Sequence, residues 1–115
     1  MKRLPVTYRA AALYDLEDIY RGVYRISLSH ATAEGFVARI RSRCLRIGDA
    51  PRGGRPRDDL WPGLRTVPFE KSGVIAYLVE PARVRIVNIF IGGQDYEALY
   101  RNFGAPDGDQ DTGAG

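Results

Sequence analysis

Two consecutive segments of this sequence, residues 74–80 and 83–91, carry apolar side chains at both odd and even positions. Successive residues of a β-strand point to opposite sides of a sheet, so two such strands side by side would be apolar on both faces. The sets expected to share a face are Val74, Ala76 and Leu78; Ile75, Tyr77 and Val79; Val84, Ile86 and Phe90; and Val87, Ile89 and Ile91. Burying one aliphatic side chain stabilises a fold by ~1.5–3 kcal/mol, so both faces need cover.

A pair of helices is expected to cover one face. Residues 10–27 and 30–47 both show apolar side chains at three- and four-residue spacing. The stripe of the first helix comprises Leu13, Leu16, Ile19, Tyr20, Val23 and Ile26, and that of the second Ala33, Phe36, Val37, Ile40, Cys44 and Ile47. Ser29 is expected to cap the second helix and Gly48 to end it. The short connection predicts an antiparallel hairpin.

The remaining strands are expected at residues 4–8 and 64–69, with a Pro/Gly/Arg-rich loop over residues 49–63. Hairpin turns would place the three late strands side by side in sequence order. Pro5 and Pro68 lack an amide donor, which favours the outer positions of the sheet for the N-terminal strand and for residues 64–69. A short helix is expected over residues 95–103.

These elements predict an α+β fold: an N-terminal strand, an antiparallel helical hairpin packed on a four-stranded, mainly antiparallel sheet, and a short C-terminal helix. One domain is expected over residues 1–103, followed by a disordered Gly/Asp-rich tail at 104–115. The last helix, with Trp61 from the loop, is expected to cover most of the second sheet face. A partner protein would then complete the remainder.

Composition excludes several classes of protein. The chain has 115 residues, too few for two ordinary domains. Its longest apolar runs fall far short of the ~20 residues of a membrane span, and no secretory signal is visible. One cysteine, Cys44, and one histidine, His30, exclude an internal disulfide and argue against a metal site or a Cys/His catalytic pair. Cys44 is expected to be buried and His30 exposed. Nothing beside Gly92 and Gly93 resembles a phosphate-binding loop, so no cofactor is expected.

The basic residues are mostly arginine. Only Lys2 and Lys71 among seventeen basic residues are lysine, and the formal net charge is +3. Eight arginines lie between residues 39 and 65: Arg39, Arg41, Arg43, Arg46, Arg52, Arg55, Arg57 and Arg65. The guanidinium group suits carboxylate and phosphate, so this cluster indicates an anionic partner, either nucleic acid or an acidic protein segment. The alternative interpretation is a solvated helix face.

Several short motifs occur in a characteristic order. Residues 8–19 lead from a strand through alanines into Asp15-Leu16 and Ile19. The loop reads Pro51-Arg52-Gly53-Gly54-Arg55 and then Leu60-Trp61-Pro62-Gly63-Leu64-Arg65. Two apolar strands and Gly92-Gly93-Gln94-Asp95-Tyr96 follow. Over about residues 4–101 this combination resembles the RelE/ParE toxins of type II toxin–antitoxin modules, and the loop resembles the ParE branch.

The resemblance implies a cytoplasmic bacterial toxin with no membrane association. It implies a hetero-oligomer with a cognate antitoxin that is ParD-like, with a ribbon-helix-helix part and an acidic C-terminal segment. The ParE branch is associated with inhibition of DNA gyrase by binding. Where many ParE sequences carry His and Arg in the segment after the last strand, this chain has Ile91 and Gln94.

Two alternatives remain open at the level of the sequence. One is a RelE-like, ribosome-dependent mRNA endonuclease, for which the weak catalytic candidates are Arg65, Lys71 and Tyr100. Most of the cations that this branch uses are absent, so Tyr100 is expected to pack on the sheet. The other is a non-toxic partner-binding domain on the same scaffold. The candidate partner-binding residues are Arg52, Arg55, Arg57, Trp61, Arg65, Arg83, Arg85, Tyr96 and Arg101.

Overall fold

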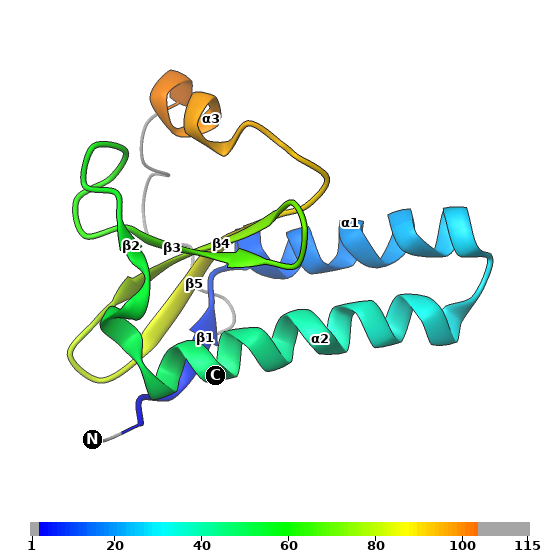
Figure 1. Ribbon diagram of the computed structural model, residues 1–115, viewed down its shortest axis with the longest axis horizontal. Coiled ribbons are helices and arrows are strands. Elements are labelled where there is room, and N and C mark those ends of the chain that lie inside the picture. The colour runs from blue at the N-terminus through cyan, green and yellow to red at the C-terminus, as the bar shows by residue number, and fades with distance from the viewer. Residues whose placement is uncertain (1–2, 104–115) are drawn as a thin grey trace.

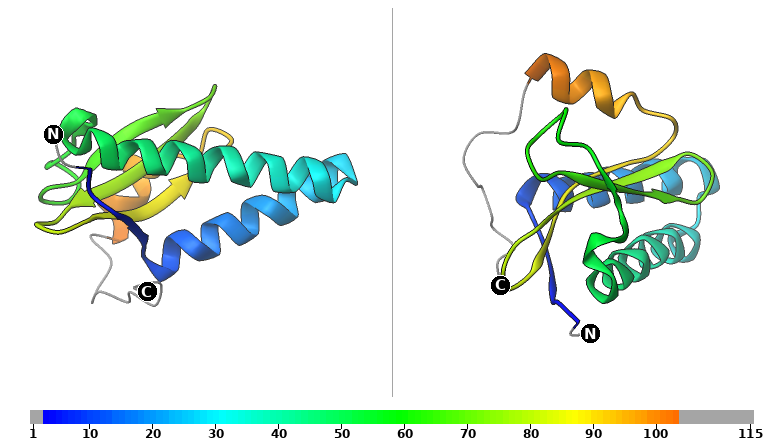
Figure 2. Two further views of the ribbon diagram at one scale, coloured as in Figure 1. Left: turned by 90° about the horizontal axis from the view of Figure 1, so that it is seen from below. Right: turned by 60° about the vertical axis from the view of Figure 1, so that its left-hand side comes forward.

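The computed structural model of the chain describes residues 3–103, so the expected tail at 104–115 lies outside the described residues. The elements are β1 (Val6–Tyr8), α1 (Ala10–Ser27), α2 (His30–Asp49), a 3-10 turn η1 (Pro51–Gly53), β2 (Arg55–Pro56), β3 (Arg65–Phe69), β4 (Gly73–Val79), β5 (Val84–Phe90) and α3 (Tyr96–Phe103). The α1–α2 hairpin packs on one side of the sheet, and α3 lies on the other (Figures 1 and 2). The α+β class is confirmed.

The sheet has five strands in the order β1-β5-β4-β3-β2, one more than expected. β1 is an edge strand, as Pro5 indicated, and pairs in parallel with β5. The expectation that residues 64–69 form the other edge is wrong, because β2 pairs with Arg65 and Thr66. Pro68 lies beyond the reach of this two-residue strand. Pro68, which has no amide donor, therefore lies in the part of β3 that does not pair with β2.

The helical hairpin follows the apolar periodicity, with two corrections. The Ser29 cap is confirmed: its hydroxyl accepts from the Thr32 amide at 3.1 Å. Gly48 does not end α2, which continues to Asp49. Instead, Gly48 lets the N-terminal segment approach, and the Leu4 amide donates to the Gly48 carbonyl at 3.0 Å. Ile26, expected on the inner stripe, is 88% exposed. It is exposed because the loop end of the hairpin extends past the strands (Figure 1).

Both faces of the sheet are covered by the chain itself, as expected for most of the second face. The helical side holds the larger core, which includes Leu16, Ile40, Ile75, Tyr77 and Ile86. The other side holds a smaller core made by Leu60, Leu64, Ala76, Val87, Phe90 and Tyr100, with Trp61 and Tyr96 packed against it. α3 and the loop before β3 supply the cover for this second core. No helix within residues 3–103 is long and apolar enough to cross a membrane.

The expected alternation along β5 is wrong in its second half. Ala76 pairs with Asn88 but Tyr77 pairs with Ile86, so one extra residue of β5 lies between the two pairs. Such a bulge reverses which face the following side chains occupy. Ile89 therefore joins Val84 and Ile86 in the core of the helical side, while Val87 and Phe90 face α3.

Candidate functional site

The Pro/Gly/Arg loop is fixed at its base by the phenol of Tyr77, which is fully buried. The phenol accepts from the Gly54 amide at 2.9 Å and donates to the Pro51 carbonyl at 2.8 Å. The Arg65 guanidinium donates to the carbonyls of Arg52 and Gly54 at 3.0 and 2.8 Å. Burial raises the pKa of Tyr77 above its ordinary value. The backbone of Pro51, Arg52 and Gly54 is thus joined to β3 and β4 by hydrogen bonds with side chains of those strands.

Arg57 ties this loop to α3. It is 4% exposed and donates to both carboxylate oxygens of Asp59 at 3.0 and 2.7 Å. It also bonds to the Glu97 carboxylate and to the Tyr96 hydroxyl on α3. The hydrogen bond from Arg57 lowers the pKa of Asp59. Arg101 reaches Asp59 at 3.6 Å and Glu97 at 3.8 Å, which completes a network between the loop and the last helix.

The nine expected partner-binding residues fall into three places. Arg57, Trp61, Tyr96 and Arg101 gather where the loop meets α3. Arg52, Arg55 and Arg65 lie at η1, β2 and β3. Arg83 and Arg85 flank Glu80 at the β4–β5 turn, with contacts of 2.8 and 3.2 Å. Arg52, Arg55 and Arg101 are exposed, whereas Arg57 and Arg85 are buried and form ion pairs within the chain.

The three weak catalytic candidates do not lie on one surface. Tyr100 is 2% exposed and donates to the Asn88 side chain at 2.8 Å, so it packs on the sheet as expected. Burial raises its pKa. Arg65 pairs directly with Tyr77 and so shares the helical side of the sheet, opposite to Tyr100. Lys71 is exposed in the turn between β3 and β4.

Asp15 is a half-buried residue of α1 that was not among the predicted site residues. Its carboxylate accepts from the Ile89 amide at 2.9 Å and from the Asn88 side chain at 3.0 Å, which joins α1 to β5 beyond the bulge. Burial raises the pKa of this carboxyl above its ordinary value of 3.8. The only signal in the sequence was its place in the Asp-Leu motif of α1.

The raised pKa of Asp15 has a predictable effect on stability. At pH values between the lower pKa of Asp15 in the unfolded chain and its higher pKa in the folded protein, the folded state binds more protons. The contribution of Asp15 to the free energy of unfolding therefore falls as pH rises between these two values, and it is constant above the folded pKa. The stability of the native protein relative to Asp15→Asn should therefore decline as pH rises from 3 to 7. Urea denaturation of both proteins at several pH values measures this difference. A stability difference that instead rises with pH over this range would contradict the raised pKa of Asp15.

Cys44 is buried as expected, and His30 is exposed and stacks on Tyr24 with ring centroids 4.2 Å apart. Burial raises the pKa of the Cys44 thiol to about 11. Within residues 3–103 no group of three or more His, Cys, Asp or Glu side chains is placed to hold a metal ion.

A thiol reagent should therefore modify native Cys44 about 10³-fold more slowly than the unfolded chain, because reaction requires local or global opening. Ellman-type absorbance at pH 8, with and without urea, measures both rates. A Ser42→Cys, Cys44→Ala variant, with its thiol exposed on the same helix, should react fast in both conditions. Equal native rates for the two proteins would contradict the burial of Cys44.

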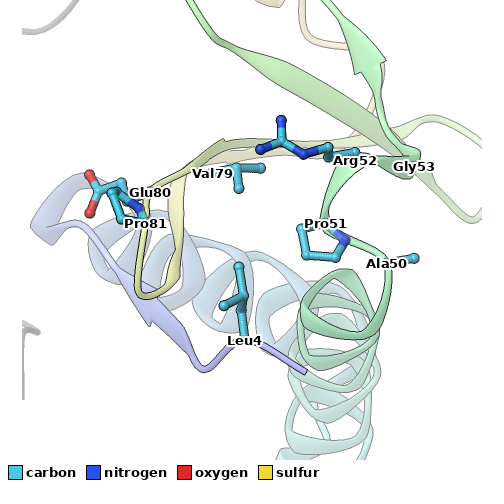
Figure 3. A pocket seen from close by; sticks show the side chains of 8 residues that line it. All are labelled: Leu4, Ala50, Pro51, Arg52, Gly53, Val79, Glu80 and Pro81. Atoms are coloured by element: carbon cyan, nitrogen blue, oxygen red, sulfur yellow. The ribbon is translucent and has the colours of Figure 1, made fainter. Parts of the chain in front are cut away.

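Two open surfaces accompany the helical hairpin. At its loop end, Ile26 and Leu28 are 88% and 76% exposed, and a groove of about 400 Å³ runs between α1 and Ile91. Along α2, Arg39, Arg43 and Arg46 share one face of the helix and line a polar groove of about 370 Å³ against β3. A separate pocket of about 620 Å³ lies beside Arg52, where Leu4, Pro51 and Val79 face one another (Figure 3).

Comparison with known proteins identifies a family and a similar solved structure. The family model described as ParE toxin of type II toxin-antitoxin system, parDE, matches residues 6–96. A solved structure described as "Chromosomal ParDE TA system from P. aeruginosa" is similar with a TM-score of 0.64 and 22% identity, covering 76% of this chain and 94% of that chain. At this identity the likeness shows a shared fold. No curated protein matches.

Proposed function

The chain belongs to the ParE toxin family of type II toxin–antitoxin systems, and from this membership we propose that it inhibits DNA gyrase by binding and is neutralised by a cognate antitoxin. The observation that carries a binding mechanism is the dispersal of Arg65, Lys71 and Tyr100. Cleavage of RNA by attack of a 2′-hydroxyl needs cations and a proton-transferring group around one phosphate. The buried hydroxyl of Tyr100 and the guanidinium of Arg65 lie on opposite sides of the sheet. This arrangement favours binding over endonuclease chemistry. Since gyrase is a cytoplasmic enzyme, the proposed activity would take place in the cytoplasm.

The proposal is tested by two assays run side by side. Gyrase supercoiling and DNA cleavage are measured with the purified chain, and mRNA is mapped in a coupled translation reaction. Inhibited supercoiling with intact mRNA is the expected result. Codon-phased mRNA cuts that Tyr100→Phe abolishes would instead establish the endonuclease. Neither effect, together with tight binding of the antitoxin, would identify a non-toxic partner-binding domain.

For the antitoxin we propose a ParD-like protein whose acidic C-terminal segment lies along the loop end of the helical hairpin and continues toward the exposed arginines. Ile26 lines one groove with Ile19, Val23 and Ile91, and a contiguous apolar surface of this kind is typical of an interaction site. The groove beside Ile91 also contains Arg25, which suits a segment with both apolar and acidic side chains. Arg52, Arg55 and Arg101 supply further exposed cations for carboxylates.

Ile26→Asp should weaken antitoxin binding by about tenfold or more, because it places a carboxylate in an apolar contact and repels an acidic segment. Isothermal titration with the product of the adjacent reading frame measures the affinity. Leu45→Asp, at a leucine that is 63% exposed on α2 and does not line this groove, is the matched control and should stay within about twofold. Equal losses of affinity in the two variants would show that the antitoxin does not bind in this groove.

A further inference from the structure

Arg9 is a buried cation at the junction of β1 and α1. Its backbone is fixed: its amide donates to the Ile86 carbonyl at 2.9 Å, and its carbonyl accepts from the Leu13 amide at 3.1 Å. The residue is 4% exposed, and its guanidinium carbon lies 5.9 Å from the centre of the Trp61 ring. The Nε and Nη1 atoms are enclosed, and no residue in the described range 3–103 accepts a hydrogen bond from them.

Within residues 3–103 no carboxylate accepts a hydrogen bond from Nε or Nη1 of this guanidinium. The charge of Arg9 acts on Asp15, but that carboxylate accepts its hydrogen bonds from the Asn88 side chain and the Ile89 amide. The first turn of α1 contains no acidic residue, and its N-terminus has no side-chain cap. A helix N-terminus carries partial positive charge, so it adds to the positive potential beside Arg9.

Arg57 gives an internal comparison. It is as buried as Arg9, yet two carboxylates and a tyrosine hydroxyl accept from it. Buried charges in proteins are ordinarily paired in this way, because an ion removed from water without a partner is strongly destabilising. Among the described residues 3–103, Arg9 lacks such a hydrogen-bonded partner, which is the feature expected of a receptor for an added anion.

We propose that Arg9 binds one oxyanion, a carboxylate or phosphate group, which enters beside the Trp61 ring. The Trp61 side chain could cover an anion bound to Arg9, since Trp61 is half-buried and lies in the turn between Arg57 and Leu64. The planar fork of arginine donors matches both kinds of oxyanion. This site lies on the α3 side of the sheet, away from the groove proposed for the antitoxin, and it does not depend on gyrase being the target.

Trp61 is the single tryptophan of the chain, so its fluorescence reports directly on this site. The full-length protein is titrated with inorganic phosphate and, separately, with acetate, at constant ionic strength maintained with chloride. A saturable change in emission is expected, together with a rise in Tm of about 5 °C when the anion exceeds its Kd about tenfold. Arg9→Met should lose both responses, and Arg46→Met, at an exposed arginine on α2, should retain them.

Each outcome decides the proposal. A response to phosphate alone identifies a phosphate ligand, a response to acetate alone identifies a carboxylate, and equal responses identify a site that accepts either oxyanion. The absence of a saturable response in the native protein overturns the site, as does an equal response to chloride or in Arg9→Met. Without anion, Arg9→Met should melt no lower than the native protein, because it removes an uncompensated buried charge. A large fall in its Tm would make Arg9 a structural residue and also overturn the proposal.

Discussion

Gly48→Ala should lower the free energy of unfolding by about 3 kcal/mol, although alanine is the better helix former. A Cβ at this position would lie well inside van der Waals contact with the Leu4 carbonyl oxygen and close against the Val6 side chain. The atom it meets belongs to the backbone, so no side-chain rotation relieves the clash. Either β1 moves away from α2, which breaks the bond between the Leu4 amide and the Gly48 carbonyl, or the end of α2 shifts.

The matched control is Gly35→Ala, in the same helix. A Cβ at Gly35 would meet nothing within 4 Å beyond its own helix, so this change should stabilise the protein by about 0.5–1 kcal/mol through helix propensity alone. Urea denaturation of the two variants beside the native chain measures both effects. A Gly48→Ala variant as stable as Gly35→Ala would show that the N-terminal segment does not pack against α2 as described.

The helices and the three late strands could be predicted from the sequence because their signals are local. The apolar period of α1 and α2 and the Ser29 cap are read within a few residues of one another. The doubly apolar strands also predicted a covered second face, and α3 with Trp61 supplies that cover. The second face could be predicted to be covered because apolar side chains must be buried, and this requirement holds whichever residues make the contacts.

What the sequence did not reveal depends on contacts between distant segments. The role of Gly48 is set by Leu4, more than forty positions earlier. The bulge in β5 follows from its register against β4, and β2 is too short to carry a periodic signal. The sequence indicated that Arg57 is a cation suited to an anionic partner. It did not indicate that its partners are Asp59 and Glu97 of the same chain, because the contact with Glu97 joins distant segments.

Tyr77→Phe should lower the free energy of unfolding by about 2 kcal/mol while leaving the packing of the ring in place. The change removes one hydroxyl, but it leaves the buried Gly54 amide without its acceptor and the Pro51 carbonyl without its donor. A buried polar group that loses its partner costs about 1–3 kcal/mol. Arg65 still holds the Gly54 carbonyl, so the loop should loosen at its base without detaching.

Hydrogen exchange distinguishes this local effect from a general loss of stability. In Tyr77→Phe the Gly54 amide should exchange much faster, while amides in the middle of α2 should accelerate only as far as the change in global stability requires. Tyr14→Phe, at a tyrosine that is 67% exposed, is the matched control and should alter neither stability nor exchange. If the arginines of this loop contact a partner, Tyr77→Phe should also weaken that partner's binding, since their backbone positions depend on the Tyr77 hydroxyl. Unchanged Gly54 exchange in Tyr77→Phe would show that the phenol does not fix the loop.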